Sequence, residues 1–259
     1  TYIVITLEGH PYEHLIFLLG RIHKIKVFAY QTTYITKSHF SMFLNLGINF
    51  LPTKILASGK ISYDLLRTKF HTQKVILLGS NKYKKKLKIK KIDNSNCLVI
   101  PTGLESETTD LLRLCFESLK KEKDLNCKFI LRLHPQINKF NFIKKNQLLL
   151  KNEKRIQISN SKLIDDICSC KFVLYGVSSA VVEAVQQGLV PIHFHDSKNE
   201  FEYDPLWQLK QKIIINNSNE LIKFFKKRIF FSQKKILRYI NFANNFYRPV
   251  NYKKLREIF

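Results

Sequence analysis

A short stretch near the start of the chain places a carboxylate and two imidazoles close together. Glu8-Gly9 follows an apolar run of strand length, and His10, Glu13 and His14 come directly after it. A carboxylate at a strand end can serve as a general base, whereas two His four residues apart on a helix are typical of zinc peptidases. The stretch is therefore compatible with two different chemistries, general-base catalysis and zinc binding.

The zinc interpretation requires both His to project from one face of an established helix. Pro11 directly follows His10, so we expect His10 at the position before the first helical residue, with non-helical backbone. The sequence shows no downstream motif for a third ligand. We therefore predict no metal site, and His10 becomes a candidate for orienting Glu8 or an acceptor substrate. The alternative is that His10 is only an ordinary residue at the helix cap.

A second group of candidates lies in the stretch RLHPQ, residues 132–136. His134 ends an apolar strand, and Pro135 keeps it extended. Arg132 lies two residues earlier and shares the same face of the strand. We predict that Arg132, His134 and Pro135 help to bind a phosphate. The alternative is a strand end with an exposed His.

A third group lies where a strand passes into a helix. Gly176, Ser178 and Ser179 offer backbone N–H groups and two hydroxyls at a helix N-terminus, which suits an anion. Ser178 is alternatively only a helix cap. Glu183 follows one turn later, where an acidic residue can accept hydrogen bonds from ribose hydroxyls. We predict a nucleotide-binding site here.

Further polar residues follow other predicted strands. Thr102, Gly103 and Glu105 are expected to line the same site, with Gly103 allowing close approach of the backbone. Gln31 and Thr32 can donate hydrogen bonds to an acceptor sugar, or simply end a strand. The polar loop 194–209 is a candidate for closing over the ligand, or a plain surface loop.

The elements that must position these residues alternate along the chain. Apolar runs of strand length alternate with segments of helical periodicity, which is typical of parallel sheets covered on both faces. The predicted strands are 2–7, 26–30, 54–57, 74–78, 97–100, 128–133, 156–159, 171–175, 190–194 and 212–215. The predicted helices are 11–22, 106–120, one that includes 163–167, 180–187, 220–228 and 233–246.

We therefore predict an α/β protein with two Rossmann-like, doubly wound domains. The basic run 82–91 and the loop 93–96 separate them, giving domains of residues 1–93 and 94–259. The first domain looks short, as if truncated. The candidate residues fall at the carboxyl ends of strands, where such sheets bind ligands.

Composition limits the classes of partner. The 259-residue chain is 45% hydrophobic and carries a net charge of +24. This charge fits anionic substrates or an anionic membrane surface, or reflects compositional drift alone; no nucleic-acid motif accompanies it. No segment reaches a membrane span, no signal peptide is visible, and five scattered Cys predict reduced thiols. We expect a cytoplasmic protein, in peripheral contact with the inner membrane face where anionic lipids attract it.

The order of these motifs resembles GT-B glycosyltransferases. More narrowly, Glu8-Gly9, His134-Pro135 and Ser178-Ser179 resemble the motifs of bacterial capsule and surface-carbohydrate enzymes that use CMP-activated acidic sugars, such as sialyltransferases, polysialyltransferases and Kdo transferases. Leu7 stands where many of those motifs have a second acid.

The resemblance implies a role for each motif. Glu8 would be the general base, and His134, Ser178 and Ser179 would stabilise the leaving phosphate without a metal or another cofactor. The substrates would be a nucleotide-sugar and a glycan or lipid-linked glycan, with Gly9, His10, Gln31 and Thr32 on the acceptor side. The alternatives are a UDP-N-acetylglucosamine 2-epimerase-like enzyme and a non-catalytic nucleotide- or glycan-binding relative. The sequence does not identify the donor sugar, acceptor or linkage.

Overall fold

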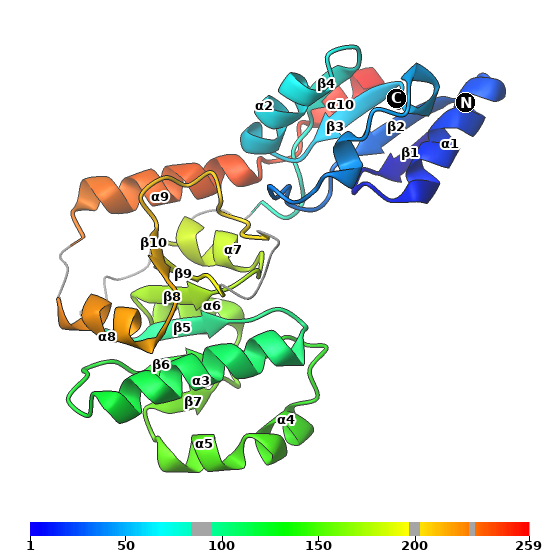
Figure 1. Cartoon of the computed structure of the whole chain (residues 1–259). Helices are drawn as coiled ribbons and strands as arrows, with labels where there is room; N and C mark the ends of the chain where they lie inside the picture. The colour runs from blue at the N-terminus through cyan, green and yellow to red at the C-terminus, as the bar shows by residue number, and fades with distance from the viewer. Residues whose placement is uncertain (84–94, 197–202, 228–230, 259) are drawn as a thin grey trace. The chain divides into compact units, whose positions relative to one another are not determined.

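The chain forms two compact α/β units in a computed structural model that describes residues 1–83, 95–196, 203–227 and 231–258 (Figure 1). The first unit comprises Thr1–Lys85 together with Phe242–Phe259, and the second comprises Lys86–Asn241. The predicted domain boundary at residues 93 and 94 and most of the basic run 82–91 lie outside the described residues. The sequence analysis grouped residues 242–259 with the second domain, whereas in the structure they pack in the first unit.

The first unit contains a parallel sheet in the order β1-β2-β3-β4 within the described chain. These strands span Tyr2–Thr6, Lys26–Tyr30, Lys54–Ala57 and Lys74–Leu77. The helices α1 (Pro11–Ile22) and α2 (Lys60–Lys69) connect successive strands, and the 3-10 turns η1 (Ser41–Phe43) and η2 (Ile48–Phe50) lie between β2 and β3. A parallel sheet needs such crossovers, because each strand must return to the same end of the sheet.

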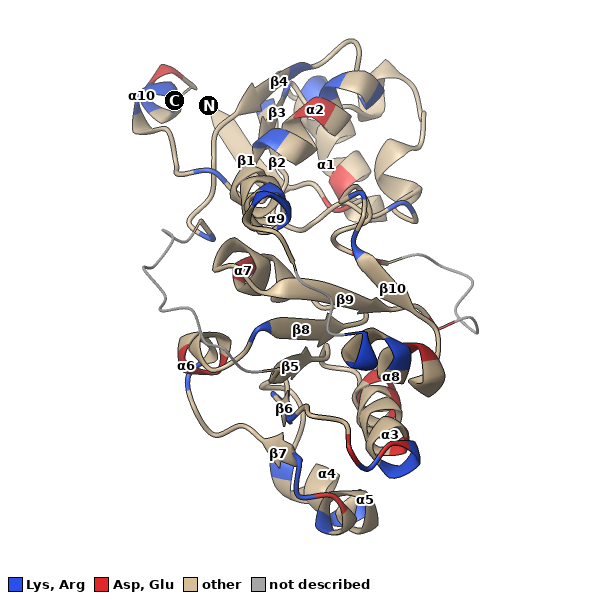
Figure 2. Cartoon of the chain, turned by 90° about the vertical axis from the view of Figure 1, so that its left-hand side faces the viewer, with Lys and Arg blue, Asp and Glu red and all other residues tan. Residues whose placement is uncertain are grey.

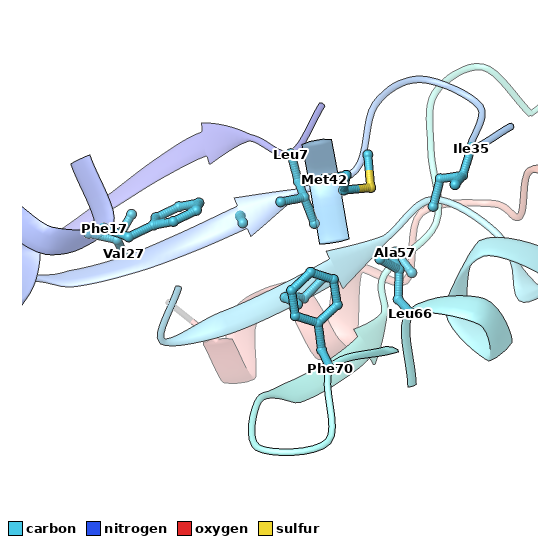
Figure 3. Packing of buried hydrophobic residues seen from close by; sticks show 10 residues of the cluster. Leu7, Phe17, Val27, Ile35, Met42, Ala57, Leu66 and Phe70 are labelled. Atoms are coloured by element: carbon cyan, nitrogen blue, oxygen red, sulfur yellow. The ribbon is translucent and has the colours of Figure 1, made fainter. Parts of the chain in front are cut away.

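One face of this sheet packs against α1 and α2 (Figure 3). Phe17 of α1 and Leu66 of α2 are buried against alternate strand residues such as Val27, Ile55 and Ala57. Alternation follows from the two-residue period of a strand, which sends neighbouring side chains to opposite faces. The core of the first unit therefore lies between the sheet and these two helices.

The other face is covered by the end of the chain. Phe28, Leu56 and Leu78 form a second cluster, against which Leu255 and Ile258 of α10 (Tyr252–Ile258) pack. The first unit is therefore covered on both faces only because residues 242–259 return to it.

The edge strand β1 and the outer side of α1 are apolar and exposed. Tyr2, Ile3 and Val4 are 40–48% exposed. The exposed large hydrophobic residues of α1 recur on one helical face and are Tyr12, Leu15, Leu19 and Ile22. This part of the first unit therefore presents an apolar surface.

The second unit contains a parallel sheet in the order β10-β9-β8-β5-β6-β7. Its strands are β5 (Cys97–Ile100), β6 (Phe129–Leu131), β7 (Ile156–Ile158), β8 (Phe172–Tyr175), β9 (Val190–Phe194) and β10 (Ile213–Ile215). All four residues of β5 and all four of β8 are buried. Such continuous apolar runs belong to strands covered on both faces.

Helices flank this second sheet on both sides (Figure 2). On one side lie α3 (Glu105–Lys121) and α8 (Ser218–Lys226), and on the other lie α6 (Leu163–Cys168) and α7 (Val181–Gln186). The short helices α4 (Lys139–Lys145) and α5 (Gln147–Asn152) lie between β6 and β7, and α9 (Gln233–Phe246) leads into the end of the chain. The predicted fold class, two Rossmann-like α/β units with parallel sheets, is confirmed.

Basic side chains occur on elements of both units rather than on one. Figure 2 shows Lys and Arg on α2, α4, α5 and α8, among other elements. No helix within the described residues is long and apolar enough to cross a membrane.

Candidate functional site

The loop that follows β1 is organised by a buried carboxylate. Glu13 is fully buried, and its oxygens accept hydrogen bonds from the backbone N–H groups of Glu8, Gly9 and His10 at 2.8–3.1 Å and from the Thr6 hydroxyl at 2.9 Å. Glu13 is the third residue of α1, where a negative charge is also favoured by the helix dipole. The loop is therefore fixed before any substrate binds.

Gly9 is required by the tight packing of this loop. Its φ is +85°, and a Cβ atom there would lie 2.5 Å from the backbone nitrogen of Met42. Only glycine fits both the backbone conformation and the space.

Glu8 lies half-buried among polar side chains of the first unit. Its Oε1 accepts a hydrogen bond from the Thr32 hydroxyl, and its Oε2 lies 3.5 Å from His10 Nε2. Partial burial lowers the pKa of His39, and the nearby Glu8 carboxylate raises it by a smaller amount. The structure thus brings together the predicted residues Glu8, His10 and Thr32, and adds His39, which the sequence analysis missed.

Gln31 has a different environment from Thr32. It is buried, its Oε1 accepts from the backbone N–H and the hydroxyl of Ser58 at 3.2 and 2.7 Å, and its amide donates to the Thr33 carbonyl. Its polar atoms therefore join the ends of β2 and β3, and the side chain does not lie with Glu8.

The His residues of the first stretch have separate surroundings. His10 is the residue before α1, with φ −78° and ψ 143°, as predicted from Pro11. His14 is buried, with Nδ1 3.2 Å from the Phe50 carbonyl oxygen. Within the described ranges, no three His, Cys, Asp or Glu side chains are grouped as a metal site would require.

In the second unit, the loops after β5 and β6 contact each other. A Cβ atom on Gly103 would lie 2.2 Å from Gln136 Oε1 and 3.1 Å from His134 Nδ1, so this glycine allows the close approach that was predicted. The backbone N–H of Gln136 donates to His134 Nδ1 at 3.3 Å. Because Nδ1 accepts in this arrangement, Nε2–H remains the hydrogen-bond donor of a neutral His134.

Glu107 connects the loops after β5 and β8. Its Oε2 accepts from the backbone N–H of Thr102 at 2.9 Å and from the Thr102 hydroxyl, and its Oε1 accepts from the backbone N–H of Val177 at 3.0 Å. A Cβ atom on Gly176 would lie 2.5 Å from this same Oε1. The predicted residues Thr102, Gly103, His134 and Gly176 therefore lie at one edge of the second sheet, joined by a residue that the sequence analysis missed.

Ser178, Ser179 and Glu183 continue from this edge. Ser178 is buried and Ser179 is exposed, and neither hydroxyl forms a hydrogen bond to another described residue. The backbone N–H groups of Val181 and Val182 bond to the carbonyls of Ser178 and Ser179, so the turn into α7 starts at these serines. Glu183 is half-buried in the first turn of α7.

Arg132 has partners of its own. Its guanidinium donates to Asp166 Oδ2 at 2.8 Å and to the Ser161 carbonyl at 2.7 Å, while the Asp166 carboxylate also accepts from the Ser159 hydroxyl. Arg132 therefore ties β6 to the segment between β7 and α6, whereas Pro135 is exposed beside His134.

A buried charged cluster lies behind the ends of β8 and β9. Asp204 Oδ1 accepts from the Tyr175 hydroxyl at 3.0 Å, and the Lys212 ammonium lies 2.7 Å from Asp204 Oδ2. Burial and the Asp204 carboxylate raise the pKa of Tyr175, which keeps its phenol protonated as a donor. The described part of the loop 194–209 is therefore held to the sheet by Asp204.

Four of the five thiols are buried, and Cys168 is half-buried. All five Cys are free, and burial raises the pKa of Cys97, Cys115 and Cys127 well above the usual value and that of Cys170 to about 12. A thiol with a raised pKa is a poor nucleophile at neutral pH.

No protein family model and no curated protein matches this chain. Solved structures do match its fold. The calicheamicin glycosyltransferase CalG4 is 10% identical, with a TM-score of 0.62 over 95% of this chain and 68% of CalG4. HepE from Anabaena, solved in complex with UDP-glucose, is 13% identical, with a TM-score of 0.55 over 94% of this chain and 74% of HepE. A Listeria monocytogenes protein assigned provisionally to the UDP-N-acetylglucosamine 2-epimerases is 14% identical, with a TM-score of 0.55 over 95% of this chain and 69% of its own.

These similarities show the fold, two Rossmann-like units of the kind found in GT-B proteins. The same fold serves a glycosyltransferase and a protein assigned to the epimerases, so fold alone does not separate the two activities.

Proposed function

We propose that this protein is a GT-B-type glycosyltransferase that uses a nucleotide-activated sugar. The observation that carries the proposal is the meeting of Thr102, Gly103, His134 and Gly176 at one edge of the second sheet, directly before Ser178 and Ser179. Carboxyl ends of parallel strands are where open α/β sheets bind ligands. A glycosyltransferase and a protein bound to UDP-glucose share this fold, which agrees with the proposal.

In this proposal the second unit binds the leaving phosphate. Glu107 already accepts the N–H groups of Thr102 and Val177, so the phosphate takes other donors: the hydroxyls of Ser178 and Ser179 and Nε2–H of His134. Glu183 accepts from the ribose hydroxyls. These donors stabilise the negative charge that grows on the phosphate as the bond from the anomeric carbon to its oxygen breaks.

Glu8 of the first unit is proposed as the general base. The acceptor hydroxyl oxygen attacks the anomeric carbon of the donor, its proton passes to the Glu8 carboxylate, and the nucleotide leaves with the bonding electron pair. The Thr32 hydroxyl and His10 orient the carboxylate. The Glu13 carboxylate holds the backbone of Glu8 in place.

The donor class that we propose is a CMP-linked acidic sugar, from the order of the acidic, His-Pro and Ser-Ser motifs. The acceptor would be a surface polysaccharide or a glycolipid of the capsule or lipopolysaccharide type, and these roles need no metal. The net charge of +24 would hold the protein on the inner face of an anionic membrane, where lipid-linked acceptors lie. Sedimentation with phosphatidylglycerol vesicles, compared with phosphatidylcholine vesicles, tests this location.

Epimerisation is the second candidate, because the Listeria monocytogenes protein shares the fold. An epimerase converts its nucleotide-sugar without an acceptor, whereas a transferase releases the nucleotide only when it passes the sugar on. Product analysis of CMP- and UDP-sugars with and without a glycan acceptor separates the two. Binding of nucleotide without turnover in either assay would identify a non-catalytic relative.

Calorimetric titration with CMP, UDP and GDP tests the phosphate site. The double variant Ser178→Ala with Ser179→Ala should bind the preferred nucleotide at least about tenfold more weakly, because two hydroxyl hydrogen bonds to the phosphate are lost. Thr109→Ala removes a hydroxyl that donates to Glu105 within α3 and should leave the affinity unchanged. Equal affinities in all three proteins would remove Ser178 and Ser179 from the site.

A further inference from the structure

A hollow in the first unit lies apart from the residues discussed so far. Its cavity volume is about 530 Å³, and it is lined by the end of β4, Leu77–Gly79, and by residues 248–252 and Lys254. Ligand pockets typically have volumes of roughly 300–1,000 Å³. The hollow is therefore large enough for a sugar residue with its substituents.

The wall formed by the end of the chain is fixed by backbone hydrogen bonds. The N–H of Arg248 donates to the Ser58 carbonyl at 3.0 Å, the N–H of Ser80 donates to the Arg248 carbonyl at 2.7 Å, and the N–H of Asn251 donates to the Leu78 carbonyl at 2.8 Å. We call residues 246–251 the strap. A Cβ atom on Gly79 would lie 2.1 Å from the Pro249 carbonyl oxygen, so the strap lies directly on the residues that follow β4. The hollow is thus formed before a ligand binds.

The charge of the lining favours an anion. Arg248 and Lys254 line the hollow, and no Asp or Glu is among its described lining residues. Within the described chain, neither cation pairs with a carboxylate: Arg248 donates to the Asn245 side chain at 2.6 Å, and the Lys254 ammonium lies 3.5 Å from the Leu77 carbonyl oxygen. Most of their hydrogen-bonding capacity therefore remains for a ligand.

The remaining lining suits a carbohydrate. Tyr252 is 65% exposed and offers an apolar ring face, while Pro249 and Leu77 supply further apolar surface. The hollow also lies at the carboxyl end of β4, the same end of the first sheet at which Glu8 and Thr32 follow β1 and β2. The Tyr30 hydroxyl donates to the Gly79 carbonyl at 2.8 Å, and the Lys82 ammonium donates to the Thr32 carbonyl at 2.9 Å. These two hydrogen bonds link the chain at the end of β2 to the chain after β4.

We propose that this hollow binds a sugar residue that carries an anionic group, a carboxylate or a phosphate, through Arg248 and Lys254. Its assignment as a subsite for an anionic acceptor rests on the proposed function, whereas the binding of the anionic sugar does not.

The test is an NMR or calorimetric titration of the full chain with three probes. Glucuronic acid carries a carboxylate, glucose 6-phosphate carries a phosphate, and glucose is the neutral control. We expect at least one anionic sugar to bind at least about tenfold more tightly than glucose. The probe that binds identifies the anionic group, a carboxylate or a phosphate. Equal binding of all three probes, or of none, would overturn the proposal.

Matched variants separate this site from the general attraction of a basic protein for anions. Arg248→Gln and Lys254→Met each remove one lining charge, keep the aliphatic stem and leave the backbone bonds of the strap in place. Each should weaken the anionic sugar about tenfold. Lys253→Met removes an exposed charge next to the hollow but outside its lining and should change nothing. An equal loss in all three variants would show nonspecific attraction and would overturn the site.

Nucleotide titration of the same variants keeps the two proposals distinguishable. Unchanged CMP or UDP affinity in Arg248→Gln and Lys254→Met, with loss of the anionic sugar, supports the hollow as a separate site. Displacement of the sugar by a nucleotide from the same residues would make the hollow a nucleotide site and overturn the proposal. Absence of any nucleotide binding would end the proposed function while sugar binding still stood.

Discussion

At the scale of single residues, two glutamates have the same role in the two units. Glu13 is the third residue of α1 and Glu107 is the third residue of α3, and each accepts backbone N–H groups from the loop before its helix. A carboxylate at this position satisfies donors that a helix N-terminus would otherwise leave free. Both candidate loops are consequently held in shape by the protein itself.

Replacement of the proposed base separates chemistry from binding. Glu8→Gln keeps the size of the side chain but removes its ability to take a proton. We expect turnover to fall by at least about 100-fold, the usual contribution of a general base, while nucleotide affinity stays the same. Initial-rate measurement of sugar transfer beside calorimetric titration of the nucleotide gives both quantities.

Two further outcomes decide the assignment of Glu8. Asp64→Asn alters an exposed carboxylate that pairs with Lys60 on α2 of the first unit, and it should transfer sugar at the wild-type rate. If Glu8→Gln also transfers at the wild-type rate, Glu8 is not the base and His10 becomes the next residue to replace.

The sequence predicted some of these positions, and the structure explains why it missed others. Glu8, His10 and Thr32 follow strands, and their strand ends meet because the strands are parallel. The role of Glu13 has a local signal, since it stands three residues after the residue that precedes the helix. Glu107 stands at the same helical position and bonds to Thr102, but its bond to Val177 has no local signal, because Val177 lies 70 residues away.

At the scale of elements, apolar periodicity predicted most of the helices and strands. The helix Pro11–Ile22, the strand Lys54–Ala57 and the helix Gln233–Phe246 have the predicted bounds. The analysis missed α2, α4, α5 and α10. The helices α4 and α10 have only seven residues each, so their apolar periodicity is weak. The periodicity of α2 is weak because only Ser62 and Leu66 of this helix are buried. Short or mostly exposed helices depend on tertiary contacts more than on their own pattern.

The strap packs so closely against Gly79 that a side chain at this position would overlap it. Gly79 has a φ of +95° and lies against the strap, whereas Gly47 has a φ of +89° with nothing within 4 Å of an added Cβ. We expect Gly47→Ala to cost about 1 kcal/mol of unfolding free energy, from backbone strain alone. Gly79→Ala should cost about 3 kcal/mol, because the added methyl must also displace the strap.

Urea unfolding of both variants and the wild type measures this difference. If the two alanine variants are destabilised equally, the contact between Gly79 and the strap contributes nothing to stability.

At the scale of the whole molecule, the first unit is assembled from both ends of the sequence. Residues 242–259 supply the strap, which bonds to residues that directly follow β3 and β4, and α10, which covers one face of the sheet. The sequence analysis placed these residues in the second domain because they follow it directly along the chain. Periodicity identifies helices, but it does not show which sheet they cover.

Removal of the last residues should therefore affect the two units differently. A chain that ends at Asn241 exposes Phe28, Leu56 and Leu78, which α10 otherwise covers. We expect amide hydrogen exchange in β2 and β3 to become at least about tenfold faster, while β5 and β8 keep their protection. Exchange measured by mass spectrometry on both chains tests this. Equal protection of β2 and β3 in the two proteins would show that α10 is not needed for the sheet.

The contribution of residues 242–259 to the first unit has a consequence during synthesis on the ribosome. All the strands of the second sheet have been translated by Ile215, whereas the first sheet lacks the cover of its second face until residues 242–259 leave the exit tunnel. The strands of the first sheet are therefore translated before those of the second, but their unit is completed later. Until then, the apolar side chains of its sheet are open to chaperones.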